Sequence, residues 1–322
     1  MMKRREFLGC LSTAAAGSFA SATLPLGYSS AAEPSAELPT VRVVDTHTHF
    51  YDPTRPQGVP WPDKDTWLYR PVYPSDWLAV AAPLGIRETV VVEASEWVED
   101  NQWVLDLATD NPCIIGLVGN LSPHHVDFEK HLIRFAKNPI FRGIRVREGL
   151  PMLLESSDFH RGAKRLADHD LQLDLNGPPE ILSPVAKFAR EFPSLRIVID
   201  HVGGAGDPQR LTDQWRQGMA ELGKCGNVFC KVSALGEQTE ASTERFGTSP
   251  REVAFYQPIL DHCWDVFGED RLIYGSNWPV CEKGGSYADQ FDIVHAYFTG
   301  KGPEALEKYF WKNAHRVYRW AE

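Results

Sequence analysis

The chain has 322 residues and 43% hydrophobic content, enough to bury the core of one large α/β domain or of two ordinary ones. Its formal net charge is −10, and no stripe of lysine and arginine runs along it. Nucleic-acid binding depends on neutralising phosphates, so this charge excludes a nucleic-acid backbone as the partner and favours a small-molecule substrate.

The first residues, MMKRREFLGCLSTAAAGSFASA, carry the pattern of an export signal. Two adjacent arginines precede a run of alanine, serine and glycine without charge. This pattern resembles the signals that the twin-arginine export machinery reads, which lie outside the folded domain. It predicts an exported protein, periplasmic or extracellular, with no stable membrane insertion once the signal is removed. The alternative is an N-terminal helix that stays as a membrane anchor.

This pattern predicts three segments. We expect the signal over residues 1–32, a polar linker over 33–40 and one folded domain over 41–322. Five cysteines lie in the expected domain, too scattered for zinc-finger spacing. An odd number of cysteines in an exported protein cannot all pair, and we predict mostly buried thiols.

Short apolar runs recur through the domain, and each run ends in polar residues or glycine. Continuous apolar runs are typical of parallel strands covered on both faces. The expected strands are 41–49, 88–95, 113–120, 141–148, 171–177, 195–204, 227–235 and 271–278.

Amphipathic segments lie between these runs, with apolar residues at three- and four-residue spacings. They include 97–111, 127–138, 159–170 and 181–192. Strands alternating with helices in this way predict an α/β fold, a single-domain (β/α)8 TIM barrel, rather than an open doubly wound sheet. No GxGxxG sequence follows the first strand, which argues against dinucleotide binding.

The connection after the first strand, residues 51–77, is rich in proline and aromatic residues and long for a plain loop. On a barrel it would lie at the carboxyl-end face, where active sites are built. Two interpretations stay open: a wall that covers the substrate, or an ordered rim that packs on its own aromatic residues.

Three histidines fall at strand ends. In DTHTHF, His47 and His49 are two residues apart on a strand and therefore point the same way. His201 ends the sixth strand in VIDHVGG and projects into the same barrel mouth. Imidazoles grouped in this way are candidate metal ligands or oxyanion donors. The other histidines fall in helical segments or at a helix start, where we expect surface or packing roles.

These motifs, in order along residues 41–320, resemble the amidohydrolase superfamily, and within it the amidohydrolase-related branch of TIM-barrel lactone hydrolases. The matching sequences are DTHTHF, FRGIRVRE, LQLDLNGPPEI, RIVIDHVGG, NVFCKVSAL, YGSNWPV and KNAHRVYRW. The resemblance implies a (β/α)8 hydrolase. Relatives open sugar-acid lactones, such as fuconolactone and rhamnonolactone, and lactones from aromatic degradation.

The resemblance also bears on the metal content. Members with two metals carry a further histidine on the fifth strand and a carboxylated lysine on the fourth, where this chain has LDLNG and GIRVRE. A binuclear centre is therefore not expected. The resemblance implies either a single zinc ion, with His47, His49 and His201 as ligands, or no metal.

The eighth strand departs from the family at one position. Relatives end it in GSDWPV, whose aspartate binds metal or activates water, whereas this chain has Asn277. An amide cannot accept a proton near neutral pH, although its carbonyl oxygen can hold a water molecule or ligate a metal weakly. Three accounts stay open: a zinc-bound water that needs no carboxylate base, a base relocated to Glu93, Glu148 or Asp174, or a barrel that has lost hydrolysis.

Four residues are candidates for substrate binding. Arg145 is suited to a substrate carboxylate or to hydroxyl groups, and the alternative is an ion pair with Asp174 or Glu93. Lys231 would stabilise an oxyanion, or else form an ion pair with a barrel acid. We expect Trp278 to shape the rim and Glu93 to line the site.

We therefore predict a lactone hydrolase in which water attacks at the histidine cluster, with His47, His49, His201 and Asn277 as the catalytic residues. Two alternatives belong to other classes. One is a carbohydrate- or metabolite-binding barrel that lost catalysis through Asn277. The other is a decarboxylase of the same superfamily, against which the missing fifth-strand histidine argues.

Overall fold

The structure is a computed structural model that describes residues 41–243 and 245–321. The expected signal and linker lie outside the described residues, so export and the segment boundaries stay predictions. Within the part of the chain that is described, no helix is long and apolar enough to cross a membrane.

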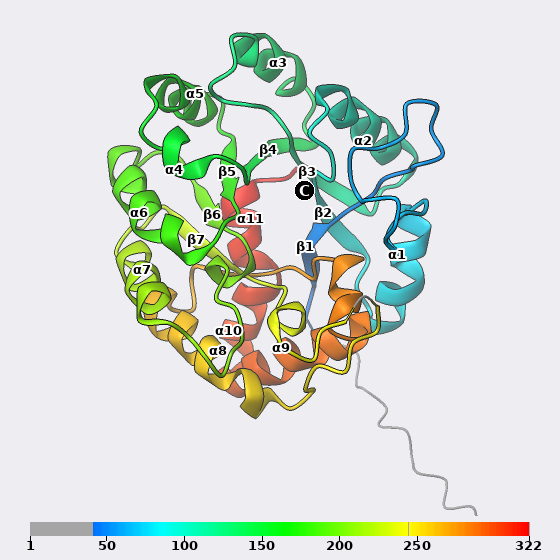
Figure 1. The fold of residues 1–322 in the computed structure, drawn as a ribbon, viewed down its shortest axis with the longest axis vertical. Coiled ribbons are helices and arrows are strands. Elements are labelled where there is room, and N and C mark those ends of the chain that lie inside the picture. The colour runs from blue at the N-terminus through cyan, green and yellow to red at the C-terminus, as the bar shows by residue number, and fades with distance from the viewer. Residues whose placement is uncertain (1–40, 244, 322) are drawn as a thin grey trace, which may run out of the picture. The chain divides into compact units, whose positions relative to one another are not determined.

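Parallel strands form one eight-stranded sheet, in which each strand pairs with the next along the chain. The strands are β1 (Val44–Thr48), β2 (Glu88–Val92), β3 (Ile114–Gly119), β4 (Phe141–Val146), β5 (Gln172–Leu175), β6 (Ile197–Ile199), β7 (Val228–Val232) and β8 (Leu272–Tyr274). Each lies within its predicted range, and the prediction of a (β/α)8 barrel is confirmed (Figure 1). The strands end earlier than predicted because the polar residues at their carboxyl ends leave the sheet and form the barrel mouth.

Helices surround the strands as a ring (Figure 1). The longer ones are α1 (Pro74–Ala81), α2 (Val98–Asp110), α3 (Phe128–Phe135), α5 (Ser157–Asp168), α6 (Leu182–Glu191), α7 (Asp213–Gly223), α8 (Val253–Phe267) and α9 (Tyr287–Lys301). The four amphipathic segments predicted from spacing are confirmed as α2, α3, α5 and α6. Their apolar faces are buried: Leu132 of α3 and Leu166 of α5 are 0% exposed.

A late helix, α11 (Asn313–Tyr318), fills the end of the barrel opposite the mouth (Figure 1). Inward-facing strand residues such as Val90 and Val198 form one buried cluster with Val317 and Tyr318. Tyr318 also donates a hydrogen bond to Asp174 Oδ2 at 3.0 Å, which links α11 to the polar interior. The barrel interior is therefore packed, and only the carboxyl-end mouth is left for chemistry.

The barrel closes where β1 meets the residues that follow β8, a junction that we call the seam. Thr48 and Trp278 form an isolated parallel bridge there. The Asn277 amide donates to the His47 carbonyl at 2.8 Å, and the His49 amide donates to the Trp278 carbonyl at 2.9 Å. The backbone at the seam therefore fixes the first and last catalytic candidates against each other.

All five cysteines of the described residues are free and buried, which confirms the prediction of buried thiols. They are Cys113, Cys225, Cys230, Cys263 and Cys281.

Candidate active site

The histidines predicted from strand ends lie together at the barrel mouth. The ring centroids of His47 and His49 are 5.0 Å apart, and those of His47 and His201 are 4.5 Å apart. His201, separated from the end of β6 by one residue, begins the short turn η3 (His201–Gly203) and has a left-handed φ of 54°. A non-glycine residue in this conformation is strained, and such strain is concentrated at functional sites.

His47 is the innermost of the three, with a fully buried side chain. Its Nδ1 lies 3.5 Å from Asp200 Oδ1 and 3.3 Å from Lys231 Nζ. Its Nε2 lies 3.4 Å from Arg145 Nη1, which can only donate. Burial, followed by the positive charge of Lys231, lowers the pKa of His47 well below its usual value, so the ring is neutral at pH 7.

His49 is oriented by a backbone carbonyl. Its Nδ1 lies 3.0 Å from the Val92 oxygen, which accepts only, so Nδ1 carries the hydrogen. Burial, followed by the charge of Arg145, lowers the pKa of His49 to about 3, and the ring is neutral. Its Nε2 therefore presents a lone pair, and this lone pair faces Asn277 Oδ1 at 3.1 Å.

His201 is oriented from one side by a hydroxyl group. Its Nδ1 lies 2.8 Å from the Ser233 hydroxyl oxygen. Burial lowers the pKa of His201 to about 4. The mouth thus contains neutral imidazoles, which accept hydrogen bonds and bind metals but carry no charge at pH 7.

Asn277 lies at the seam in a left-handed conformation, with a φ of 65°. Asparagine tolerates this region better than most residues. Its side-chain Nδ2 donates to Glu237 Oε2 at 2.7 Å, while Oδ1 is turned toward His49. The amide thus bridges His49 and a carboxyl group from the loop after β7.

A buried ion-pair network lies beneath the histidines. Lys231 Nζ is 2.9 Å from Asp174 Oδ2 and 2.9 Å from Asp200 Oδ1, and all three side chains are fully buried. Burial raises the pKa of Asp174 to about 6. Burial also favours the protonated form of Asp200, but the attraction of Lys231 holds the pKa of Asp200 well below its usual value. Lys231 therefore has the ion-pair contacts weighed as the alternative to oxyanion binding.

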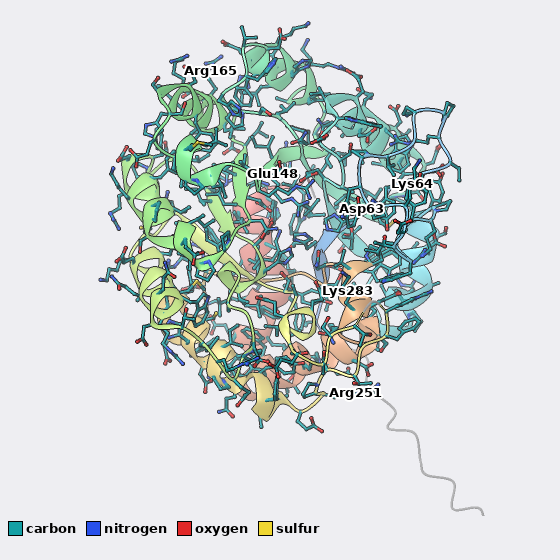
Figure 2. All side chains as sticks on the ribbon, in the orientation of Figure 1. Asp63, Lys64, Glu148, Arg165, Arg251 and Lys283 are labelled. Atoms are coloured by element: carbon teal, nitrogen blue, oxygen red, sulfur yellow. The ribbon has the colours of Figure 1, made fainter. Side chains whose placement is uncertain are left out.

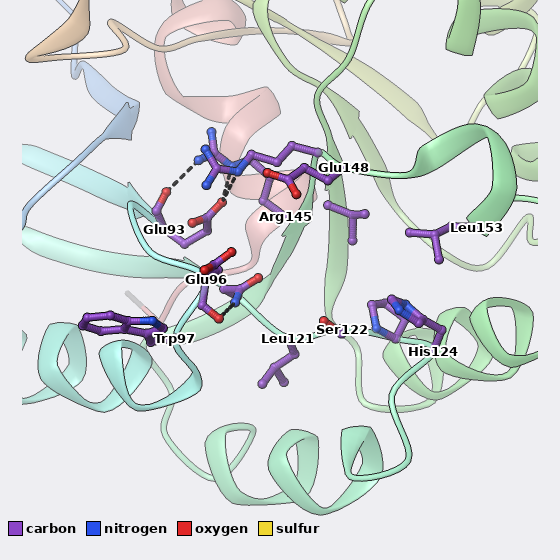
Figure 3. A pocket seen from close by; sticks show the side chains of 13 residues that line it. Glu93, Glu96, Trp97, Leu121, Ser122, His124, Arg145, Glu148 and Leu153 are labelled. Carbon is purple, nitrogen blue, oxygen red and sulfur yellow. Dashed lines mark hydrogen bonds and ion pairs between the residues drawn. The ribbon is translucent and has the colours of Figure 1, made fainter. Parts of the chain in front are cut away.

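Arg145 is paired with Glu93, one of the two acids considered for it. Arg145 Nε donates to Glu93 Oε1 at 2.8 Å, and Nη2 donates to the Glu93 carbonyl at 2.7 Å. Figure 3 shows this pair where β2 and β4 end. Because Nη1 reaches His47, Arg145 joins the histidine cluster to the space beside it.

That space is a pocket of about 420 Å³ over the ends of β2, β3 and β4 (Figure 3). Arg145 and Glu93 form part of its wall, together with Arg147 and Glu148. Figure 2 shows Glu148 over the mouth of the barrel, whereas Arg165 lies at the outer edge. The remaining polar groups on the wall come from Glu96, Asn120, Ser122 and His124. Such a wall suits a polar ligand of the size of a monosaccharide.

Trp278 does not belong to this pocket. Its ring is 1% exposed, packs against Phe50 with centroids 6.5 Å apart, and donates from Nε1 to Glu282 at 3.2 Å. Trp61 does contact the cluster, since the centroid of its ring is 5.7 Å from that of His49. Trp61 belongs to the predicted proline-rich connection and also packs on Tyr51 at 5.2 Å, as expected for a rim that packs on its own aromatic residues. A role of the connection in covering the substrate stays a prediction.

One group of side chains in the site has the spacing of a metal-binding site. Among the described residues, His47, Asp200 and His201 offer ligand atoms that all lie within 4.8 Å of one another. The facing lone pairs of His49 Nε2 and Asn277 Oδ1 are a second arrangement that a cation would satisfy. The predicted ligand set contained His49 where this group has Asp200, and the role of His49 as a ligand stays a prediction.

Three neighbours of the site were not identified from the sequence: Asp200, Glu237 and Trp61. Asp200 had a signal, since it directly precedes His201 at a strand end. Glu237 lies in a connecting turn, where spacing carries no information about direction. Trp61 was included only as one of many aromatic residues in a long loop.

The sequence and the fold of this chain are similar to those of known proteins. A family model described as amidohydrolase matches residues 44–320. The chain is 31% identical over 290 residues to an L-fucono-1,5-lactonase of Burkholderia ambifaria, covering 86% of this chain and 95% of that protein. It is 25% identical over 281 residues to an L-fucono-1,5-lactonase of Burkholderia multivorans, covering 83% and 92%. A solved amidohydrolase from Burkholderia multivorans with bound zinc has the same fold, with a TM-score of 0.79 at 22% identity over 87% of this chain and all of that one.

Proposed function

The chain belongs to the amidohydrolase family, and from that premise we propose that it is a hydrolase that opens the lactone of a sugar acid. The observation that carries the proposal is the position of the polar pocket directly beside the neutral histidines, with Arg145 between them. The relatives named as L-fucono-1,5-lactonases support the choice of a lactone as the bond that is cleaved.

The residues of the site suit water attack on a carbonyl carbon. His49 Nε2 and Asn277 Oδ1 both accept hydrogen bonds and converge at 3.1 Å, where they would hold and orient a water molecule. Arg145 is cationic and borders both the cluster and the pocket, so its Nη1 is placed to stabilise the oxyanion that forms on the lactone carbonyl. The ring hydroxyls would then lie against the polar wall of the pocket.

A divalent metal would be held by His47, Asp200 and His201, and zinc is our proposal because imidazole and carboxylate ligands suit it. When bound, such an ion lowers the pKa of a water molecule and polarises a carbonyl group. This chemistry would make a carboxylate base at position 277 unnecessary.

The charge of the pocket favours a neutral lactone over an anionic one. Arg145 is occupied by Glu93, and Arg147 Nε lies 3.8 Å from the same carboxylate. Glu96 and Glu148 add two further carboxylates to the wall. A carboxylate-bearing substrate would meet more negative than positive charge, whereas hydroxyl groups find both donors and acceptors.

The test is proton release in a pH-indicator assay with a panel of lactones, after chelation and again with added zinc. The panel contains neutral sugar-acid lactones and lactones that carry a carboxylate. We expect hydrolysis of neutral lactones that depends on zinc. Hydrolysis under both conditions would support a relocated base, and no hydrolysis of any lactone would refute the proposal in favour of a binding protein.

For the cellular location, we propose export by the twin-arginine route, supported by the paired arginines near the start of the sequence. Replacing both arginines with lysine should retain the protein in the cytoplasm, as measured by cell fractionation. Equal export of the native and the double-lysine chains would contradict the proposal.

A further inference from the structure

We propose that Glu237 is a positioning residue that locks the side-chain amide of Asn277 with its carbonyl oxygen toward His49. This inference rests on the proposed hydrolysis, because it concerns how the water-holding pair is arranged. It assigns a role to a carboxyl group that lies outside both the histidine cluster and the pocket wall.

The contact between Glu237 and Asn277 fixes the orientation of the side-chain amide. Asn277 Nδ2 donates to Glu237 Oε2 at 2.7 Å, and this places Oδ1 on the opposite side of the amide, 3.1 Å from His49 Nε2. An amide has one donating and one accepting end, so an acceptor on one side decides which end the other side receives. Glu237 supplies that acceptor in either protonation state, because a proton on Oε1 leaves Oε2 free to accept from Asn277.

The opposite orientation would be preferred without Glu237. His49 Nδ1 is committed to the Val92 carbonyl, which leaves a lone pair on Nε2. A free amide would turn its NH2 group to this lone pair and form a direct hydrogen bond. That bond would occupy both groups, and neither would then accept a hydrogen bond from water or bind a cation.

Glu237 is poorly explained as a structural residue. Its Oε1 is buried and has no hydrogen-bond partner among the described residues. Burial raises the pKa of Glu237 to about 8, and the attraction of Lys283 is the smallest of the influences on it. A buried carboxyl group with so little compensation costs stability, and such groups are concentrated at functional sites.

The fold brings Glu237 to Asn277 through a close approach of two turns. Glu237 lies in η4 (Gly236–Gln238), and Asn277 precedes η5 (Val280–Lys283). A Cβ atom on Gly284, at the end of η5, would lie 2.6 Å from the Gly236 carbonyl carbon and 2.9 Å from the Glu237 amide nitrogen. Glycine at position 284 therefore permits the two turns to approach each other, and this approach places Glu237 beside Asn277.

A carboxylate at position 277 would need no such lock, because both of its oxygens are acceptors and either can face His49. The requirement for Glu237 is thus specific to asparagine at this position. A purely structural role for Glu237 would not depend on which residue occupies position 277. The effect of Asn277→Asp therefore distinguishes the two roles.

The experiment compares Glu237→Leu, Glu237→Gln, Asn277→Asp and the double variant Glu237→Leu with Asn277→Asp. Leucine removes the acceptor, and glutamine retains an acceptor in the same shape. Glu240→Gln, an exposed glutamate three residues further along the same loop, is the matched control. Each protein is assayed for kcat and KM on the best neutral lactone and for its thermal midpoint of unfolding.

We expect Glu237→Leu to lower kcat about 10- to 100-fold, as for other groups that orient site residues, with little change in KM. Glu237→Gln should recover most of that loss. In the Glu237→Leu background, Asn277→Asp should raise kcat at least tenfold, and the same change in the native chain should gain less. The thermal midpoint of Glu237→Leu should equal or exceed that of the native protein.

Three results would overturn the proposal: native kcat in Glu237→Leu, an equal effect of Asn277→Asp in both backgrounds, or a fall in activity that follows a fall in the thermal midpoint. An inactive native protein would instead refute the proposed function. The thermal midpoints would still decide in that case, since a less stable Glu237→Leu protein would make Glu237 a structural residue.

Discussion

Arg145 Nη1 lies 3.4 Å from His47 Nε2, which places a permanent cation at the border between the histidine cluster and the pocket. The same guanidinium is fixed by two hydrogen bonds to Glu93. One side chain therefore holds the wall of the pocket and adds to the effect of burial in lowering the pKa of His49 and His201. In the proposed reaction it would also face the developing oxyanion.

Replacing Arg145 should separate its structural and chemical contributions. Arg145→Met leaves Glu93 as a buried carboxylate with only the longer contact to Arg147, and we expect a loss of about 3 kcal/mol in the free energy of unfolding. Arg145→Lys keeps the charge but cannot make both contacts to Glu93, so it should unfold closer to the native protein and still lose kcat. Urea unfolding and steady-state kinetics measure the two effects. Native kcat in Arg145→Lys would remove the guanidinium from the chemistry.

His47→Ala and His49→Ala should each abolish turnover while the barrel stays folded. The reason is that both rings supply lone pairs at the mouth, and neither belongs to the apolar core of the barrel. Loss of kcat/KM and an unchanged circular dichroism spectrum are the expected results. His125→Ala is the control, because the His125 side chain is 59% exposed and lies outside the cluster. Retained activity in either cluster variant would remove that histidine from the mechanism.

The stability of the protein should depend on pH through Glu237. Its pKa is about 8 in the folded state, against an ordinary value of 4.5. The folded protein therefore keeps a proton that the unfolded chain releases, and the free energy of unfolding falls as the pH rises between these values, with the full loss above pH 8. Glu237→Gln has no such proton, so its stability relative to the native protein should increase over this range.

Chemical denaturation at pH 5, 7 and 9 would measure that difference. The buried histidines have the opposite effect on the free energy of unfolding below about pH 6.5. Their pKa values are lower in the folded protein, so the unfolded chain binds protons that the folded protein does not. Both proteins share this effect, so the difference between them isolates Glu237. A difference that is constant from pH 5 to pH 9 would show that the carboxyl group does not titrate in this range.

The charge of the pocket should decide between neutral and anionic lactones. Glu148→Lys replaces a carboxylate over the mouth with a cation, and we expect the ratio of kcat/KM for a carboxylated lactone to that for a neutral one to rise about tenfold. That change corresponds to about 1.4 kcal/mol, within the range of one charge interaction in a partly exposed site. Arg165→Glu, on the outer edge, is the control. An unchanged ratio in Glu148→Lys would place the substrate away from Glu148.

The barrel was predictable from the sequence because each strand is a continuous apolar run, and the eight runs alternate with amphipathic segments. The histidine cluster was predictable for a related reason: the carboxyl ends of parallel strands meet at one face, so His47, His49 and His201 had to converge. Strand ends were less well placed, since polar residues that follow a strand can continue it or leave it.

The contacts between the buried charges were only partly predictable. A lysine inside a barrel must pair with an acid, but the sequence does not say that Lys231 lies between Asp174 and Asp200. Glu237 was out of reach because its position depends on two glycine-containing turns that approach each other in space. Trp278 was expected at the rim and is buried, because the chain turns at the seam and directs the ring into the core.

We expect the seam to make activity sensitive to incomplete folding. His49 and Asn277 are 228 residues apart in sequence, and they meet only where the two ends of the sheet are joined. Closing so long a loop is entropically costly, and the seam has fewer ladder pairs than the other strand junctions, so we expect the barrel to open locally there first. A small opening there would part these two side chains, which hold the water molecule in the proposed reaction, while most strands stay paired. Activity should therefore be lost at a denaturant concentration well below the one that unfolds the helices.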